Sequence, residues 1–280
     1  MATSVGQIYR QTFEILKSRI WLLLGIWVTY FAVQMVSTVL ISLVVGVSAM
    51  SGLSMGDPGA LSAGMIVPIV VLYLVYFFIY FAQIGSLTAM GSPLKQLTFG
   101  AAFNAGIKSA PTLLGVVFLL MLVYLVGMIV IGLASAVLSF VGPVGLVFSI
   151  IIFLPILVYL GCRLSLVYPV VAVESMSNPV TAITRAWSET KGHVLTIFLS
   201  VVGLFAVAMI VLLLVAMPII STAISSRTTG ELPNFASIGF SLFGLFCASI
   251  LLSIVGAVLV STIHAEIVGP LGHDESDVFS

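Results

Sequence analysis

Residues 109–162 read SAPTLLGVVFLLMLVYLVGMIVIGLASAVLSFVGPVGLVFSIIIFLPILVYLGC and contain no Asp, Glu, Lys or Arg. A helix needs about 20 apolar residues to cross the hydrocarbon core of a bilayer, so this stretch is long enough for two crossings. It also contains Gly142-Pro143, a pair that favours a turn. The stretch therefore predicts a hairpin of two transmembrane helices, 112–138 and 143–168.

The remainder of the chain has the same character. Of the 280 residues, 61% are hydrophobic and 6% are charged, whereas about 25% of residues are charged in an ordinary soluble domain. Four further stretches lack charged side chains and are each long enough for at least one crossing: 20–56, 58–94, 192–226 and 232–265. The predicted fold class is therefore an all-α polytopic membrane protein with six transmembrane helices, the other four being 20–48, 64–91, 193–220 and 237–264.

The distribution of Lys and Arg predicts the orientation of these helices, because such residues are retained on the cytoplasmic side during insertion. Arg227 lies on one side of the six-helix arrangement, and all the other basic residues lie on the opposite side: Arg10, Lys17, Arg19, Lys95, Lys108, Arg163, Arg185 and Lys191. Both termini are therefore expected to be cytoplasmic, in a bacterial inner (plasma) membrane. Residues 1–268 form the transmembrane domain in this interpretation, and 269–280 form a short acidic cytoplasmic tail.

A short amphipathic segment precedes the first, third and fifth predicted spans, at 4–17, 94–108 and 179–191. The third segment begins most clearly, with Asn178 as the N-cap and Pro179 at the first helical position. Amphipathic helices with basic and aromatic residues lie in the membrane surface. We therefore predict three repeats of an interfacial helix plus two spans, approximately 1–92, 93–176 and 177–268, with these residues at the cytoplasmic surface: Phe13, Lys17, Lys108, Arg185, Trp187 and Lys191.

Three pieces of sequence around the fourth span carry a resemblance to known proteins: RLSLVYPVVAVE at 163–174, PVTAITRAW at 179–187 and TKG at 190–192. They resemble the membrane-domain family named after glycerophosphodiester phosphodiesterases, and the related YciC-like six-span bacterial proteins. The resemblance implies a helical inner-membrane domain followed by an amphipathic helix. It does not imply phosphodiesterase activity, because that chemistry belongs to a separate soluble barrel in some relatives, and no stretch here is polar enough to fold as one.

Arg163 and Glu174 are the candidate polar centre. Both lie near the cytoplasmic end of the fourth span, and Tyr168-Pro169 between them is expected to break the helix. Because an ionisable residue at membrane depth is usually paired, we expect Arg163 to contact Glu174. The simpler alternative is that Arg163 extends to lipid phosphates and that Glu174 is solvated.

A stripe of polar side chains runs along the first two spans. It consists of Gln34, Tyr73, Tyr76, Tyr80 and Gln83. Such a stripe could line a ligand cavity, but side chains of this kind more often form hydrogen bonds between neighbouring helices. We favour the second interpretation, and we expect Gln34 to meet the hydroxyl group of Tyr76 or Tyr80.

The sequence gives no sign of a catalytic, cofactor-binding or metal-binding site. His193, His264 and His273 are dispersed, and His264 and Glu266 have the wrong spacing for two ligands on one helical face. No Ser/His/Asp set, phosphate-binding glycine loop or intramembrane carboxylate pair is evident. A net charge of zero also argues against nucleic-acid binding. The expected protein is therefore not an enzyme and has no cofactor.

The favoured function is that of a non-enzymatic inner-membrane protein that organises or handles lipid or another amphiphile. Its expected partners are membrane lipids, and a second copy of the chain or another membrane protein is left open. Two alternatives remain. One is a transporter or channel with a pathway between the repeats, and the other is a structural subunit of a membrane complex.

Overall fold

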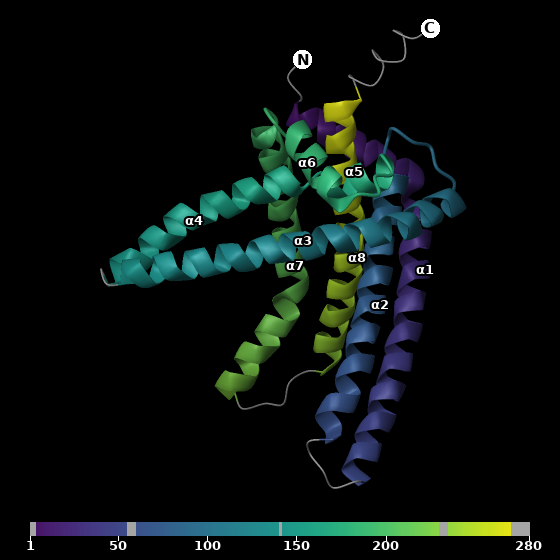
Figure 1. Cartoon of the computed structure of the whole chain (residues 1–280), viewed down its shortest axis with the longest axis vertical. Coiled ribbons are helices and arrows are strands. Elements are labelled where there is room, and N and C mark those ends of the chain that lie inside the picture. The colour runs from purple at the N-terminus through teal and green to yellow at the C-terminus, as the bar shows by residue number, and fades with distance from the viewer. Residues whose placement is uncertain (1–3, 55–59, 140–141, 230–234, 270–280) are drawn as a thin grey trace.

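The computed structural model describes residues 4–54, 60–139, 142–229 and 235–269 (Figure 1), and no strand occurs among them. Their eight helices are α1 (Val5–Ser54), α2 (Ala60–Gly91), α3 (Phe99–Ser139), α4 (Pro143–Leu164), α5 (Val167–Val173), α6 (Pro179–Glu189), α7 (Val194–Thr229) and α8 (Phe235–Val268). Six segments are long and apolar enough to cross a membrane: Val5–Leu43, Ile69–Gly91, Phe99–Ala136, Ile151–Val173, Val194–Thr222 and Phe235–Val268. The predictions of an all-α chain and of six long apolar helices are therefore confirmed, and the architecture is that of a multi-pass membrane protein.

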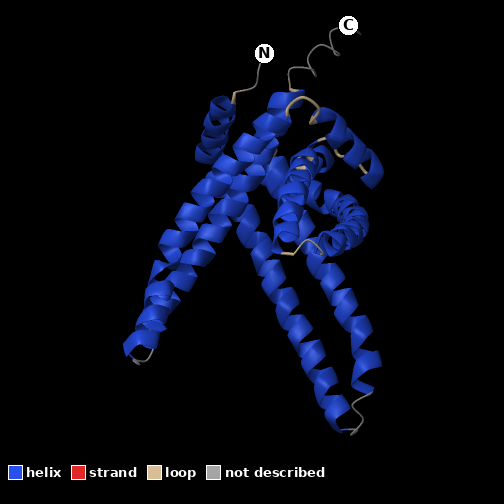
Figure 2. Ribbon diagram, turned by 90° about the vertical axis from the view of Figure 1, so that its left-hand side faces the viewer, coloured by secondary structure: helices blue, strands red, loops and turns tan. Residues whose placement is uncertain are grey.

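The helices meet at one end of the molecule. From this end, which carries the start of α1 and the end of α8, the long helices α1, α2, α7 and α8 run downward in Figure 1, while α3 and α4 run across them. The α1–α2 and α7–α8 hairpins diverge below it (Figure 2). The buried core lies where the helices meet, and its largest fully buried side chains include Leu23, Met90, Leu113, Ile197 and Leu259.

Close contact between α2 and α3 depends on glycine. A Cβ atom added to Gly106 would collide with the carbonyl oxygen of Ala82 and the hydroxyl of Ser86, and one added to Gly85 would collide with the hydroxyl of Ser109. Small residues at such positions let two helix backbones approach closely within a membrane. The crossing of α3 over α2 therefore requires these glycines.

Two of the three predicted interfacial segments are not separate helices. Residues 5–17 belong to the continuous helix α1, and residues 99–108 belong to the continuous helix α3. The prediction of separate interfacial helices is therefore wrong for these two segments. The first part of α1 nevertheless crosses the top of the molecule before the helix turns downward (Figure 1).

The physical reason for this difference lies at the ends of the segments. No proline or glycine separates Lys17 from Trp21, so nothing ends the helix there. The third segment is a separate helix, α6, and Gly192 follows it with a φ of +88°. Glycine adopts this left-handed conformation at little cost, which is why helices commonly stop at such a residue.

The turn and the break around α4 follow from glycine and proline. Gly142 has a φ of +76° and directly precedes Pro143 at the start of α4, as the turn signal predicts. The predicted break at Tyr168-Pro169 lies instead at Ser165–Leu166, between α4 and α5, and Pro169 is inside α5. A proline ring clashes with the carbonyl group four residues earlier, which here belongs to Ser165. The proline therefore acts one helical turn before its own position.

Candidate functional site

A cavity of about 580 Å³ lies between the two diverging hairpins, and its lining comes from α1, α2, α5, α7 and α8. Gln34, Tyr76, Tyr80 and Gln83 of the predicted stripe line it. Most of the remaining lining is apolar or small, including Trp27, Leu87, Tyr168, Leu204, Leu252 and Gly256. The stripe therefore faces a cavity as well as a neighbouring helix.

Gln34 and Gln83 form the polar pair of this cavity. The Gln34 side-chain NH₂ group donates to Gln83 Oε1 at 3.2 Å, and Gln83 is buried. No direct hydrogen bond joins Gln34 to the hydroxyl of Tyr76 or Tyr80 among the described residues, so the predicted contact is not confirmed. A carboxamide carries both donors and an acceptor, so two glutamines at the same depth can satisfy each other.

Tyr73 lies outside this cavity. Its side chain is exposed, and it lines a second cavity of about 420 Å³ with Thr38, Ser42 and Tyr76. The structure thus brings four of the five predicted stripe residues to one cavity and leaves Tyr73 beside another.

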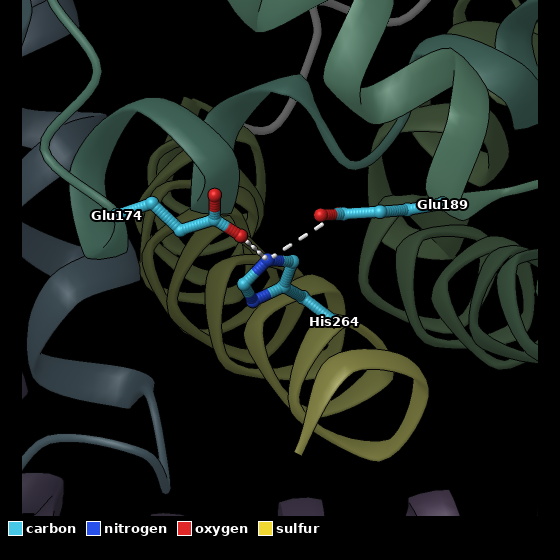
Figure 3. A group of neighbouring side chains, drawn as sticks. All are labelled: Glu174, Glu189 and His264. Carbon is cyan, nitrogen blue, oxygen red and sulfur yellow. Dashed lines mark hydrogen bonds and ion pairs between the residues drawn. The ribbon is translucent and has the colours of Figure 1, made fainter. Parts of the chain in front are cut away.

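A cluster of charged side chains lies at the packed end of the molecule, where α5, α6 and α8 meet (Figure 3). Glu174 caps the C-terminus of α5, Arg185 and Glu189 lie one turn apart on α6, and His264 is in the last turns of α8. His264 Nε2 lies 2.9 Å from Glu174 Oε1 and 3.6 Å from Glu189 Oε2. Arg185 Nε lies 3.5 Å from Glu174 Oε2 and 2.5 Å from Glu189 Oε1.

Burial governs the electrostatics of this cluster. The His264 side chain is fully buried, and 8% of the Glu189 side chain is exposed. Burial, and then the negative charge of Glu174, raises the pKa of the Glu189 carboxyl above its ordinary value. Burial also raises the pKa of Glu174, but the hydrogen bond from His264 and the charges of His264 and Arg185 outweigh it and hold this pKa below its ordinary value. The pKa values of the two carboxyl groups are therefore shifted in opposite directions, although both groups contact Arg185 and His264.

Arg163 is not part of this cluster. Its Nη1 group donates to the Trp187 carbonyl at 2.9 Å and to Thr190 Oγ1 at 3.3 Å. Its guanidinium carbon also lies 4.8 Å from the centre of the Trp187 ring and 5.3 Å from that of Tyr159. No ion pair joins Arg163 to Glu174 among the described residues, so the predicted pair is wrong.

The predicted surface residues have different surroundings. Phe13, Lys17 and Lys191 have exposed side chains. Lys108 is exposed as well, and it lines a pocket of about 380 Å³ together with Lys95 and Asn104. Trp187 packs on Arg163 and on the Tyr159 ring, and Arg185 joins the charged cluster.

His264 and Glu189 are the site residues that the sequence did not identify. Helical spacing relates ligands within one helix, whereas Glu174, Glu189 and His264 come from separate helices. The one local signal is that His264 and Glu266 interrupt the end of an otherwise uncharged stretch. That signal does not identify the carboxylates that meet the histidine.

Comparison of the chain with family models, with curated proteins and with solved structures gives no match. The resemblance of residues 163–192 to a membrane-domain family therefore stays a prediction.

Proposed function

We propose that the protein is a non-enzymatic membrane protein that binds a lipid or another amphiphile in the cavity between the α1–α2 and α7–α8 hairpins. The observation that carries this proposal is the composition of the cavity lining. The wall is mainly apolar, and its polar groups include the Gln34–Gln83 pair and the nearby tyrosines. Ligand pockets typically combine an apolar wall with a few polar groups that orient the ligand.

The cavity suits an amphiphile better than an ion. None of the described residues that line it is Asp, Glu, Lys, Arg or His. An ion that enters a membrane protein needs charged side chains or several converging carbonyl groups in place of its hydration shell. An acyl chain needs only apolar surface, and the glutamine pair can hydrogen-bond to an ester or hydroxyl group.

The proposal extends to the cellular setting. We place the protein in a bacterial inner membrane with both termini in the cytoplasm. We also propose that it is a relative of the membrane-domain family that residues 163–192 resemble. Two observations support this placement: the start of α1 and the end of α8 lie at the same end of the molecule, and all basic residues except Arg227 fall on one side of the predicted arrangement. The three repeats of approximately 1–92, 93–176 and 177–268 belong to the same proposal.

A transporter is the second candidate function. The cavity is lined by helices of the first and third proposed repeats, with Tyr168 from the second, and transporters commonly bind their substrates at a repeat interface. Uptake of a fluorescent lipid analogue across liposomes that contain the protein distinguishes the two functions, because a binding protein alone gives no transmembrane flux.

The proposed function is tested by a substitution that fills the cavity and should therefore weaken ligand binding. Gly256 lines it, and a Cβ atom added there meets no other atom within 4 Å, so Gly256→Leu places a side chain in the cavity. The matched control is Gly127→Leu on α3, where an added Cβ atom also meets nothing within 4 Å. Native mass spectrometry and photo-crosslinking with a diazirine fatty acid measure binding. We expect Gly256→Leu to weaken binding about tenfold, or about 1.4 kcal/mol, and Gly127→Leu to leave it unchanged. Equal labelling of the wild type and both variants contradicts the proposal.

A further inference from the structure

We propose that Glu174, Glu189 and His264 form a binding site for a divalent transition-metal ion of the Zn²⁺ type. One ligand atom from each of the three residues lies within 4.8 Å of the other two. This site is separate from the apolar cavity, which none of the three residues lines. The proposal therefore does not depend on the proposed function.

Each of the two carboxylates, Glu174 and Glu189, directs one oxygen toward Arg185 and the other toward His264. Arg185 Nε contacts Glu174 Oε2 and Glu189 Oε1. The other two oxygens, Glu174 Oε1 and Glu189 Oε2, lie next to His264 Nε2 (Figure 3). Arg185 thus orients both carboxylates, and each keeps one oxygen directed toward the imidazole. This is the arrangement in which an outer group holds the direct ligands of a metal ion in place.

The separations of these atoms suit a small ion. His264 Nε2 lies 2.9 Å from Glu174 Oε1 and 3.6 Å from Glu189 Oε2. Ligands about 2.0–2.2 Å from a common Zn²⁺ ion in tetrahedral geometry are about 3.3–3.6 Å apart. All three ligand atoms lie within 4.8 Å of one another, so ion binding would require side-chain rotations that bring the most widely separated pair closer together. The three ligands also come from three helices of the packed end, which hold them in position.

Burial provides an independent observation that points to a ligand. The Glu189 side chain is 8% exposed, and Glu189 Oε2 is buried and accepts no hydrogen bond within the described part of the chain. A buried carboxylate oxygen without a partner is costly. Arg185 is the one Arg or Lys side chain in contact with the two carboxyl groups among the described residues. A cation beside His264 Nε2 would add positive charge between these groups and would bind Glu189 Oε2.

The ligand types indicate the class of ion. Imidazole nitrogen favours Zn²⁺ and neighbouring first-row metals, whereas Mg²⁺ and Ca²⁺ prefer oxygen ligands alone. No cysteine belongs to the site, which argues against a soft ion such as Cu⁺. Three protein ligands also leave one position of a tetrahedral Zn²⁺ ion for water.

The test measures metal binding to the full-length protein, purified in detergent with an affinity tag that contains no histidine. After treatment with a chelator and removal of the chelator, the protein is dialysed against Zn²⁺, and the bound metal is counted by mass spectrometry. We expect about one Zn²⁺ per chain, bound at least about 100-fold more weakly by His264→Gln, because loss of a supporting residue alone costs 10–100-fold. The matched control is His193→Gln, which removes a histidine outside the cluster and should retain the ion.

A second measurement keeps the test decisive if His264→Gln does not fold. Co²⁺ in a site with one imidazole and two carboxylates gives visible absorption bands, and Zn²⁺ should abolish them in the wild type. Size-exclusion chromatography shows whether each variant is folded. The proposal is overturned if the wild type binds no Zn²⁺ and gives no Co²⁺ bands, or if a folded His264→Gln variant binds Zn²⁺ as tightly as the wild type.

Discussion

Arg163 and Glu174 both contact α6, but they contact different faces of it. Arg163 meets Trp187 and the adjacent Thr190, whereas Glu174 meets Arg185. Residues three or four positions apart share a face of a helix, so Arg185 lies on the same face as Glu189 and not on that of Trp187. Arg163 therefore stabilises the α4–α6 contact, and Glu174 belongs to the contact among α5, α6 and α8.

This separation predicts that the two charges act independently. We expect the losses of unfolding free energy from Arg163→Leu and Glu174→Gln to add within about 0.5 kcal/mol in the double variant. The reference cycle pairs Glu174→Gln with Arg185→Leu, which are in contact, and should show a larger coupling energy. Thermal unfolding in detergent measures both cycles. A stronger coupling for Arg163 with Glu174 than for the reference pair would mean that the two residues interact after all.

At the scale of elements, the packing of α2 against α3 depends on the absence of side chains at the crossing. An added Cβ atom at Gly106 would meet the backbone oxygen of Ala82, which cannot rotate away as the end of a long side chain can. Tyr30 of α1 joins the same region, since its hydroxyl lies 3.0 Å from Ser86 Oγ and its ring stacks on Phe103. Three helices are therefore held together around a contact that tolerates no larger residue.

The crossing predicts opposite results for two alanine substitutions in α3. Gly106→Ala should destabilise the protein by about 1–3 kcal/mol, because overpacking forces the two helix backbones apart. Gly100→Ala is the control on the same helix: a Cβ atom there meets nothing within 4 Å, so the variant should be as stable as the wild type or slightly more stable. Melting temperatures in one detergent compare the variants. Similar melting temperatures for the two would show that α2 and α3 can separate without loss of stability.

At the scale of the whole molecule, a large apolar surface remains outside the packed end. Side chains on the diverging and crossing helices are widely exposed, for example Val123 at 67% and Leu214 at 67%. A soluble monomer rarely exposes so much continuous apolar surface. In a bilayer, acyl chains cover such side chains, and the backbone groups are already satisfied within the helices.

The placement of both termini in the cytoplasm predicts a pattern of chemical labelling. Single cysteines are introduced into a background in which Cys162 and Cys247 are replaced. Cysteines at Ser54 and Thr228, near the ends of α1 and α7, should react with a membrane-impermeant maleimide added to intact cells or spheroplasts. A cysteine at Ser4 should react only after the membrane is permeabilised. Labelling of Ser4 from outside would invert the proposed orientation.

Much of the fold and little of the candidate site could be predicted. The turn at Gly142 and the start of α6 were both identified correctly: the Asn178 side chain accepts hydrogen bonds from the backbone of Val180 and Thr181. Such features depend on a few neighbouring residues. Gln34 contacts α2 as predicted, but through Gln83, and Arg163 and Glu174 contact α6 and α8 and not each other. These pairings depend on how each helix is rotated against its neighbours, which the residues of one helix do not fix. The acidic tail at 269–280 lies almost entirely outside the described residues and stays a prediction.

The sequence by itself determined that the chain is helical and suited to a membrane, because a long stretch without charge must avoid water whatever surrounds it. Only the tertiary structure decided that Gln83 pairs with Gln34 and that His264 meets Glu174 and Glu189. The reason is that these helices are apolar on every side, so hydrophobic periodicity does not show which face meets the protein and which meets lipid. Close packing at small residues and hydrogen bonds between helices set the rotation of each helix about its own axis. Both kinds of contact exist only once the helices are assembled.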